Sequence, residues 1–430
     1  MLFTLQLSLW TMVCVTFFIV MWLLSHKQDR PIPIWVEDVG WFLSGLLLFY
    51  TLNNGQYVVY NNYLYQAQAF LQGRLDIPDM PLHLESVMVS SRTYMHFAPG
   101  PAILALPMVA IFGLDFNIAR LAMVLGAANL ALITRLLRNL GFDKLHQRVW
   151  LTAFIGLGCV HFFCAVLGWS WFVGHVATWF FLLLALVCAT QAFKGAVWLA
   201  GFFYACAVTC RMPMLLSFPL FAYFIAWRKD AEGAFWQRVD WKRLLVFCAG
   251  AVIPGGLYML FNWLRYGSLM DRGYNLTFAK DYPDRSGGPL GLRYVPYNLY
   301  SLLLMAPEFA QAAPYIIPSQ AGTSLTFTTP ALYYGLSARS PKHWPGLVPV
   351  LWVTAVVCAV PFLLNYGNGM AQFSMRYAMD FLPFLLLLAA IRIRAGWVQF
   401  GGLARFWITL GIWIQGWGIL YWYHFYCYNG

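Results

Sequence analysis

The stretch WLTAFIGLGCVHFFCAVL, residues 150–167, runs without a single charged side chain. Comparable apolar runs occur at 5–24, 42–52 and 347–364. Such runs approach the roughly 20 apolar residues that an α-helix needs to cross a bilayer. With 61% hydrophobic and 10% charged residues, the composition excludes a water-soluble globular protein. We therefore predict an all-α polytopic membrane protein, with residues 1–430 forming a single transmembrane domain.

The formal charge of +11 is distributed unevenly along the chain. Most Lys and Arg residues fall in alternate short connections between apolar runs: Lys27 and Arg30; Arg135, Arg138, Lys144 and Arg148; Lys194; Arg228 to Arg243; Arg339 and Lys342; Arg392 to Arg405. Because short cytoplasmic loops of membrane proteins are rich in Lys and Arg, we expect these connections on the cytoplasmic side. The two long polar stretches, 53–97 and 262–322, then both lie on the outer side. Since topology accounts for the positive charge, nucleic-acid binding is not expected.

This alternation predicts about twelve spanning helices with both chain ends outside. The first, 5–24, is expected to be a retained helix, because no Lys or Arg precedes it and no cleavage site follows it. Residues 196–227 should divide into two short helices, because Arg211 and Pro213 interrupt the apolar run. Further spans are expected from about Ile34, over 117–137, through TFTTPALYYGL (326–336), over 347–364 and from about Asp380.

Two segments on the outer side are expected to be helical without crossing. YNNYLYQAQAFLQGRLDIPDMP (60–81) begins as an amphipathic surface helix that Gly73 ends, with apolar residues at helical spacing at Leu64, Ala67 and Leu71. PGPAILALPMVAIFG (99–113) is apolar but carries three prolines and is too short to cross. We expect it to lie half-embedded in the outer side of the membrane.

Several stretches occur in an order and spacing that resemble a known family. They are FLQGRL (70–75), YMHFAPGPAILALP (94–107), IARLAMVLGAANLALITRLLRNLG (118–141), FNWLRYGSLMDRGY (261–274), YNLYSLLLMAPEF (297–309) and FSMRYAMDFLPFLLLL (373–388). Together they resemble the bacterial members of the GT-C superfamily of integral membrane glycosyltransferases. The resemblance covers about residues 50 to 390, and its individual motifs are degenerate.

This resemblance implies the transfer of one sugar from a polyprenyl-phosphate carrier to an acceptor at the outer face of the bacterial inner membrane. Nucleotide sugars are cytoplasmic and cannot reach outer loops, so a lipid-linked donor also follows from the predicted topology. Loops 53–97 and 262–322, with segment 99–113, would then form the active-site cap. The acceptor stays open between a protein, a lipid and a glycan. Membrane lipids are the other expected partners.

Sugar transfer needs a carboxylate that takes the proton of the acceptor hydroxyl. The family places this base in the first outer loop, but the acidic pair that usually precedes the surface helix is replaced here by Asn61 and Asn62. Glu85 is the preferred base, with Asp76 and Asp79 as the other candidates. Each could equally be an ordinary solvated loop acid. The three could ligate a divalent metal, but no spacing demands one, and no cofactor is predicted.

Other polar residues are candidates for holding the acceptor and the carrier phosphate. His96, with Tyr94 and His175, could orient the acceptor or the base, although a histidine beside aromatic residues is more often structural. Arginine side chains suit phosphate oxygens. Arg376 and Arg265 are preferred for the phosphate, and the alternative for Arg376 is a structural pair with Asp380. The remaining candidates are Arg272, Lys280, Arg285 and Arg293, whose alternative is snorkelling to the interface, and, more weakly, Arg211, whose alternative is pairing within the bundle.

Two other functional classes stay open. A transporter or lipid flippase would carry charged groups near the middle of the membrane and two symmetric halves. Most charges here lie at the ends of the apolar runs, and no internal repeat is visible. A non-catalytic assembly subunit would tolerate the loss of every acid in the outer loops.

Overall fold

A computed structural model describes residues 10–12, 33–228, 235–282, 287–312 and 314–426. Most of the expected first span and Arg285 lie outside the described residues. The described chain is mainly helical, as the sequence predicted.

The helices follow one another along the chain with few long irregular segments. They are α2 (Ile34–Asn53), α3 (Asn62–Leu71), α4 (Gly100–Phe112), α5 (Ile118–Asn139), α6 (Leu145–Leu157), α7 (Val160–Leu167), α8 (Ser170–Ala189), α9 (Ala196–Cys210), α10 (Phe218–Ala226), α11 (Trp241–Tyr266), α12 (Gly273–Asp281), α13 (Val295–Leu303), α14 (Leu325–Thr328), α15 (Leu347–Leu364), α16 (Leu382–Ala395) and α17 (Trp397–Tyr421). Three 3-10 helices matter for the packing: η2 (Met212–Ser217), η5 (Pro330–Ser337) and η6 (Arg376–Asp380).

The described residues also form three two-stranded sheets of short strands. Antiparallel pairs join β1 (Val87–Val89) to β2 (Arg92–Tyr94) and β3 (Glu308–Phe309) to β4 (Ile316–Ile317). A parallel pair joins β5 (Ala321–Thr323) to β6 (Gln372–Ser374). The parallel pair ties the end of the second outer loop to the segment that leads into η6.

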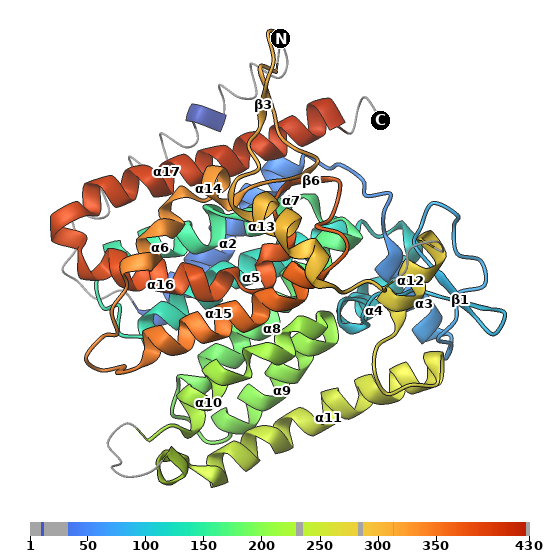
Figure 1. Ribbon diagram of the computed structural model, residues 1–430, viewed down its shortest axis with the longest axis horizontal. Helices are drawn as coiled ribbons and strands as arrows, with labels where there is room; N and C mark the ends of the chain where they lie inside the picture. The colour runs from blue at the N-terminus through green and yellow to red at the C-terminus, as the bar shows by residue number, and fades with distance from the viewer. Residues whose placement is uncertain (1–9, 13–32, 229–234, 283–286, 313, 427–430) are drawn as a thin grey trace.

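The bundle is built around α5 and α8. Helix α5 packs against α2 and α8, α8 packs against α9, and α9 packs against α11. Figure 1 shows α17 along one flank and α11 along the opposite flank, while α3, α4, α12 and the β1–β2 hairpin gather at one end. The site residues discussed below lie mainly at this end.

Small residues allow α9 and α11 to cross closely. A Cβ atom at Gly201 of α9 would lie 1.8 Å from the carbonyl oxygen of Phe247 on α11. On the other helix, a Cβ at Gly250 would lie 2.0 Å from the carbonyl oxygen of Trp198. Only glycine fits at either position, as is common where helices pack inside a bilayer.

The apolar run 150–167, which the composition suggested as one span, is bent. Helices α6 and α7 meet at an angle of 62°, with Cys159 in an extended conformation between them. The ring of His161 compensates for the lost backbone hydrogen bond, because its Nδ1 lies 2.9 Å from the carbonyl oxygen of Gly156. Its Nε2 lies 3.0 Å from the side-chain amide of Asn129 on α5. A polar group deep in the bundle is thus satisfied internally, as the bilayer requires.

The expected count of about twelve spans is not confirmed. Among the described residues, four helices are long and apolar enough to cross a membrane, or five if the bent pair is one span. The expected spanning helix over 326–336 is wrong, because Pro330 follows α14 after one residue and the chain continues as η5. The expected break near Arg211 is confirmed, since α9 ends at Cys210 and η2 precedes α10. Such breaks cut apolar runs into pieces that are shorter than a full span.

The helix predicted in the first long polar stretch is confirmed as α3, and its place along the membrane surface stays a prediction. It ends before Gly73, whose φ of +69° suits glycine. Leu64 and Ala67 are fully buried and face the rest of the protein, including α4, whereas Leu71 is half exposed. The apolar face of α3 is therefore covered largely by protein.

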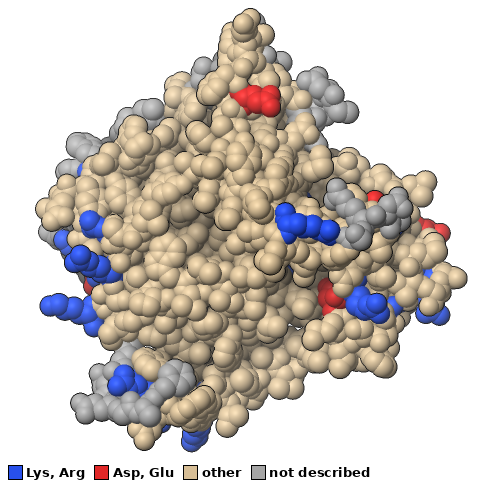
Figure 2. All heavy atoms as spheres, in the orientation of Figure 1, with Lys and Arg blue, Asp and Glu red and all other residues tan. Residues whose placement is uncertain are grey.

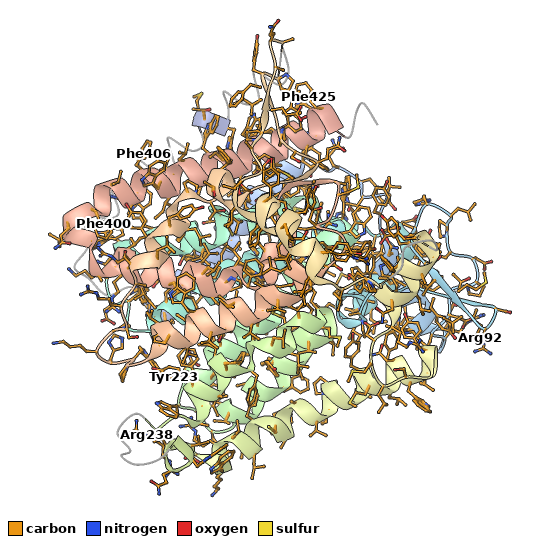
Figure 3. All side chains as sticks on the ribbon, in the orientation of Figure 1. Arg92, Tyr223, Arg238, Phe400, Phe406 and Phe425 are labelled. Carbon is orange, nitrogen blue, oxygen red and sulfur yellow. The ribbon has the colours of Figure 1, made fainter. Side chains whose placement is uncertain are left out.

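Charged side chains gather at two ends of the molecule. Figure 2 shows most Lys and Arg of the visible face at opposite ends, with a wide band of uncharged residues between them. In Figure 3, Arg92 of the β1–β2 hairpin and Arg238 of the connection before α11 mark these two ends. This separation is the one expected of a protein whose helices run across a bilayer.

Candidate functional site

The first outer loop is folded back on itself by the β1–β2 hairpin. Ser90 and Ser91 form its turn with φ of 48° and 63°, which brings the segments before β1 and after β2 together. Glu85 precedes the hairpin and His96 follows it. The side chain of Asn62, at the start of α3, donates to the carbonyl oxygen of Glu85 over 3.3 Å. Asn62 therefore holds the backbone of the candidate base.

The carboxylate of Glu85 leans against an aromatic side chain of α8. Its Oε2 accepts a hydrogen bond of 3.0 Å from the indole Nε1 of Trp171, and its side chain remains 44% exposed. Burial against this wall raises the pKa of Glu85 above its usual range. The Trp171 hydrogen bond and the attraction of Arg376 and Lys280 oppose that rise, while Asp281 adds to it. A carboxylate with a raised pKa is better suited to accept a proton.

His96 lies beside this carboxylate as a neutral ring. Its Nε2 is 3.6 Å from Oε2 of Glu85, and the ring packs edge-on against Tyr274 of α12 with centroids 5.3 Å apart. Burial, followed by repulsion from Arg265 and Lys280, lowers the pKa of His96 to about 3. The two side chains therefore do not form an ion pair at neutral pH. Its Nδ1 is buried and makes no hydrogen bond within the described residues.

Arg376 opens η6 and approaches the site from the C-terminal part of the chain. The guanidinium donates to the carbonyl oxygen of Met370 over 2.8 Å. It lies over three aromatic rings, 5.7 Å from Trp171, 5.6 Å from Phe172 and 5.2 Å from Tyr377. No carboxylate lies within 4.0 Å of it in the part of the chain that the structure describes. Arg376 is thus a largely buried cation without an ion-pair partner among the described residues.

Asp380, the expected structural alternative for Arg376, is paired elsewhere. Arg211 donates two hydrogen bonds to it, from Nε over 2.6 Å and from its terminal nitrogen over 2.7 Å. His175 Nδ1 lies 3.7 Å from the same carboxylate. Arg211 therefore forms a buried ion pair with Asp380 of η6, and the ring of His175 on α8 lies beside that pair.

The second outer loop contributes one buried cation, Arg265, and one exposed cation, Lys280. Arg265 is buried within the last turn of α11, which extends four residues further than the expected loop start at 262. It donates to the carbonyl oxygen of Met95 over 2.6 Å and to Asn262 over 3.0 Å. Lys280 is exposed and donates to the carbonyl oxygen of Ser86 over 3.2 Å. Arg265 and Lys280 therefore tie the second outer loop to both sides of the β1–β2 hairpin.

The remaining candidates make no hydrogen bond or ion pair with Glu85 among the described residues. Asp76 pairs with Arg74 over 2.8 Å, and this contact holds the pKa of Asp76 below its usual range. Asp79 is an exposed turn residue. Tyr94 is buried against Tyr266, with ring centroids 6.4 Å apart. Arg272 is exposed at the start of α12, and Arg293 stacks on Tyr294.

Three carboxylates in one loop had suggested a possible metal site. Among the described residues, no three His, Cys, Asp or Glu side chains come together as a set of metal ligands. Asp76 is bound by Arg74, while Glu85 accepts from Trp171. The arrangement instead combines one carboxylate and one free cation on an aromatic wall.

Trp171 was missed in the sequence, although the motif GWSW (168–171) carries two tryptophans where a helix begins. Trp169, Trp171 and Tyr60 form a cluster, with centroids of 4.8 Å between Tyr60 and Trp171 and 5.2 Å between Tyr60 and Trp169. Tryptophan at a helix end of a membrane protein usually signals the interface. Only the fold shows that one of these indoles contacts the candidate base.

Comparison with known proteins yields two structural neighbours. No protein-family model and no curated protein matches the chain. The crystal structure of ArnT from Cupriavidus metallidurans bound to undecaprenyl phosphate has 14% identity and a TM-score of 0.48, covering 84% of this chain. The Archaeoglobus fulgidus oligosaccharyltransferase, in a complex with zinc and sulfate, has 13% identity and a TM-score of 0.44, covering 88%. This chain spans 60% and 53% of the length of these two proteins.

Proposed function

We propose that this protein is a GT-C-type membrane glycosyltransferase. It transfers one sugar from a polyprenyl-phosphate carrier to an acceptor at the outer face of the bacterial inner membrane. The observation that carries the proposal is that Trp171 contacts both Glu85, through its Nε1, and Arg376, through its ring. One is a carboxylate with a raised pKa, and the other is a cation with no carboxylate partner among the described residues.

The residues divide the reaction between them. Glu85 takes the proton of the acceptor hydroxyl while that oxygen forms a bond to the anomeric carbon of the donor sugar. The bond between this carbon and the carrier phosphate oxygen breaks, and its electron pair leaves with the phosphate. Arg376 stabilises the added negative charge, because a fixed cation in a site of low polarity acts strongly on a developing charge. The acceptor hydroxyl belongs to a protein, a lipid or a glycan.

The two outer loops act as the cap of this site. Arg265 and Lys280 fasten the second loop to the carbonyl oxygens of Met95 and Ser86, on either side of the hairpin that follows Glu85. This fastening holds the hairpin, and with it the segment that carries Glu85, against α11 and α12. Lys280 and Arg272 are exposed near the cap and are further cations for the carrier headgroup.

Replacing Glu85 with glutamine tests the proposal directly. Glu85→Gln keeps the size of the side chain but removes its ability to take a proton, so transfer should fall by about 10² to 10⁴. The assay measures labelled product in membranes that are given a panel of polyprenyl-phosphate monosaccharides, radiolabelled in the sugar. Glu308→Gln, in the exposed β3 strand, is the matched control and should keep full transfer.

Measuring carrier binding distinguishes a residue that acts as the base from one that binds the phosphate. Glu85→Gln should bind polyprenyl phosphate as tightly as the unaltered protein, because the carboxylate makes no contact with the phosphate in this scheme. If Glu85→Gln transfers sugar at the full rate, Glu85 is not the base. The same result for Asp76→Asn and Asp79→Asn would favour a non-catalytic assembly subunit.

A further inference from the structure

The start of α8 is fixed to the first outer loop. Both the backbone N–H and the hydroxyl of Ser170 donate to the carbonyl oxygen of Tyr60, over 2.9 Å and 2.7 Å. Tyr60 lies just before α3, and its ring covers that of Trp171 at 4.8 Å between centroids. Trp171 therefore lies in the first turn of α8, and these hydrogen bonds hold that turn to the segment before α3.

Trp171 contacts both groups of the proposed reaction. Its Nε1 donates to Oε2 of Glu85 over 3.0 Å, and the guanidinium carbon of Arg376 lies 5.7 Å from its ring centroid. A cation at this distance from an indole is attracted by the ring. One side chain thus reaches the carboxylate through its polar edge and the arginine through its ring.

Little else holds the carboxylate of Glu85. The backbone of its loop is fastened through Asn62 and Lys280, but the segment from 81 to 86 has no regular secondary structure. Within the described residues, Trp171 supplies the hydrogen bond to the carboxylate, and His96 is 3.6 Å away. Oε1 makes no hydrogen bond to any described residue, which leaves it as the oxygen that can accept a proton.

We propose that Trp171 is a positioning residue that holds the Glu85 carboxylate and the Arg376 guanidinium at a fixed separation, with Oε1 turned toward the acceptor. This inference rests on the proposed function. Holding a base and a cation in place lowers the entropic cost of reaching the reactive arrangement. A misplacement of about 1 Å can lower the rate by about 10²-fold. Trp171 touches neither sugar nor phosphate in this scheme and acts through its two neighbours.

The titration of Glu85 gives a readout that a merely structural tryptophan would not change. The carboxylate faces charged groups on two elements, Arg376 on η6 and Lys280 and Asp281 on α12, and the neutral His96 lies beside it after β2. Tyr63 and Tyr274 also face it and stay un-ionised at neutral pH. The hydrogen bond from Trp171 lowers the pKa of Glu85. A base works only when deprotonated, so the transfer rate falls at low pH as Glu85 becomes protonated; we call this part of the pH–rate profile the acid limb. Loss of the hydrogen bond should move the acid limb to higher pH.

The experiment compares Trp171→Phe, Trp171→Leu and the control Trp169→Phe in the full-length protein in lipid nanodiscs. We expect Trp171→Phe to lower kcat by about tenfold or more and to shift the acid limb upward, with binding of polyprenyl phosphate unchanged. Trp171→Leu, which also removes the ring next to Arg376, should in addition weaken that binding. Trp169→Phe should leave the acid limb in place, because Trp169 contacts neither Glu85 nor Arg376 in the described contacts.

The position of the acid limb does not depend on how much protein is folded, so moderate destabilisation leaves the test intact. If Trp171→Phe does not fold, β-(3-benzothienyl)alanine at position 171 replaces the indole N–H by sulfur with the same ring shape. An unmoved acid limb with unchanged kcat in either variant overturns the inference. If Glu85→Gln abolishes transfer while these variants behave like the unaltered protein, only the role of Trp171 is refuted. If Glu85→Gln is fully active, the proposed function itself fails.

Discussion

Replacing Asp380 with asparagine should destabilise the protein far more than replacing Arg376 with glutamine. Both residues lie in η6 and both are largely buried, but only Asp380 has an ion-pair partner in the described structure. Asp380→Asn keeps the side-chain volume and removes the charge that Arg211 binds. The Arg211 guanidinium would then remain buried beside Tyr377, at 5.5 Å from the ring centroid, without an anion.

The size of the effect follows from the geometry of the pair. The Arg211 and Asp380 side chains are 15% and 3% exposed and share two short hydrogen bonds. Removing one partner of such a buried pair costs about 3 to 5 kcal/mol, because the remaining charge is left uncompensated. Arg376→Gln loses one hydrogen bond, to Met370, which is worth about 1 kcal/mol, and the attraction of the guanidinium to three aromatic rings. Glutamine carries no charge, so the variant also avoids the cost of burying a cation, which offsets part of that loss of stability.

The assay is unfolding by dodecyl sulfate in mixed micelles, followed by circular dichroism, which reports the free energy of unfolding. The double variant Asp380→Leu with Arg211→Met should recover much of the loss, since an apolar replacement of both partners leaves no buried charge. Equal destabilisation by Asp380→Asn and Arg376→Gln would refute the reasoning. Arg376 would then belong to the structural network and would not be free for a phosphate.

Three further outcomes are expected. Arg376→Gln should weaken binding of polyprenyl phosphate, measured by native mass spectrometry of the protein with added carrier lipid, while Arg376→Lys should restore part of it; equal binding by all three proteins would remove Arg376 from the phosphate site. Asp76→Asn and Asp79→Asn should each keep transfer within about threefold, because Asp76 is paired locally and Asp79 is exposed at a turn. In intact cells carrying a cysteine-free background, a cysteine at Ser90 should react with an impermeant thiol reagent and one at Lys144 should not; the reverse pattern would invert the topology.

Local patterns in the sequence were enough for several features. Apolar runs and few charges indicated a helical membrane protein, and helical spacing followed by Gly73 predicted α3. Arg211 and Pro213 marked a break that the structure shows as η2. These features depend on residues within one or two turns of each other, so neighbouring sequence contains the information. Glu85 was also selected from its place in the first loop, and its role remains a prediction.

The fold had to be known for the features that depend on distant partners. The spacing of Arg376 and Asp380 suggested a local pair, yet Asp380 binds Arg211, because the fold brings the residue between α9 and η2 next to η6. The bend between α6 and α7 depends on His161 and Asn129 from another helix, which an apolar run does not reveal.

By itself, the sequence determined the class of protein, the ends where charge gathers and the loop that carries the candidate base, because hydropathy and charge act position by position along the chain. Tertiary structure alone decided that Arg376 has no ion-pair partner among the described residues and that the indole of Trp171 contacts both Arg376 and Glu85. Trp171 and Arg376 come from α8 and η6, and no periodicity encodes which side chains of two separate elements meet. That choice is made by helix packing, where close approach at a few small residues sets which surfaces come into contact.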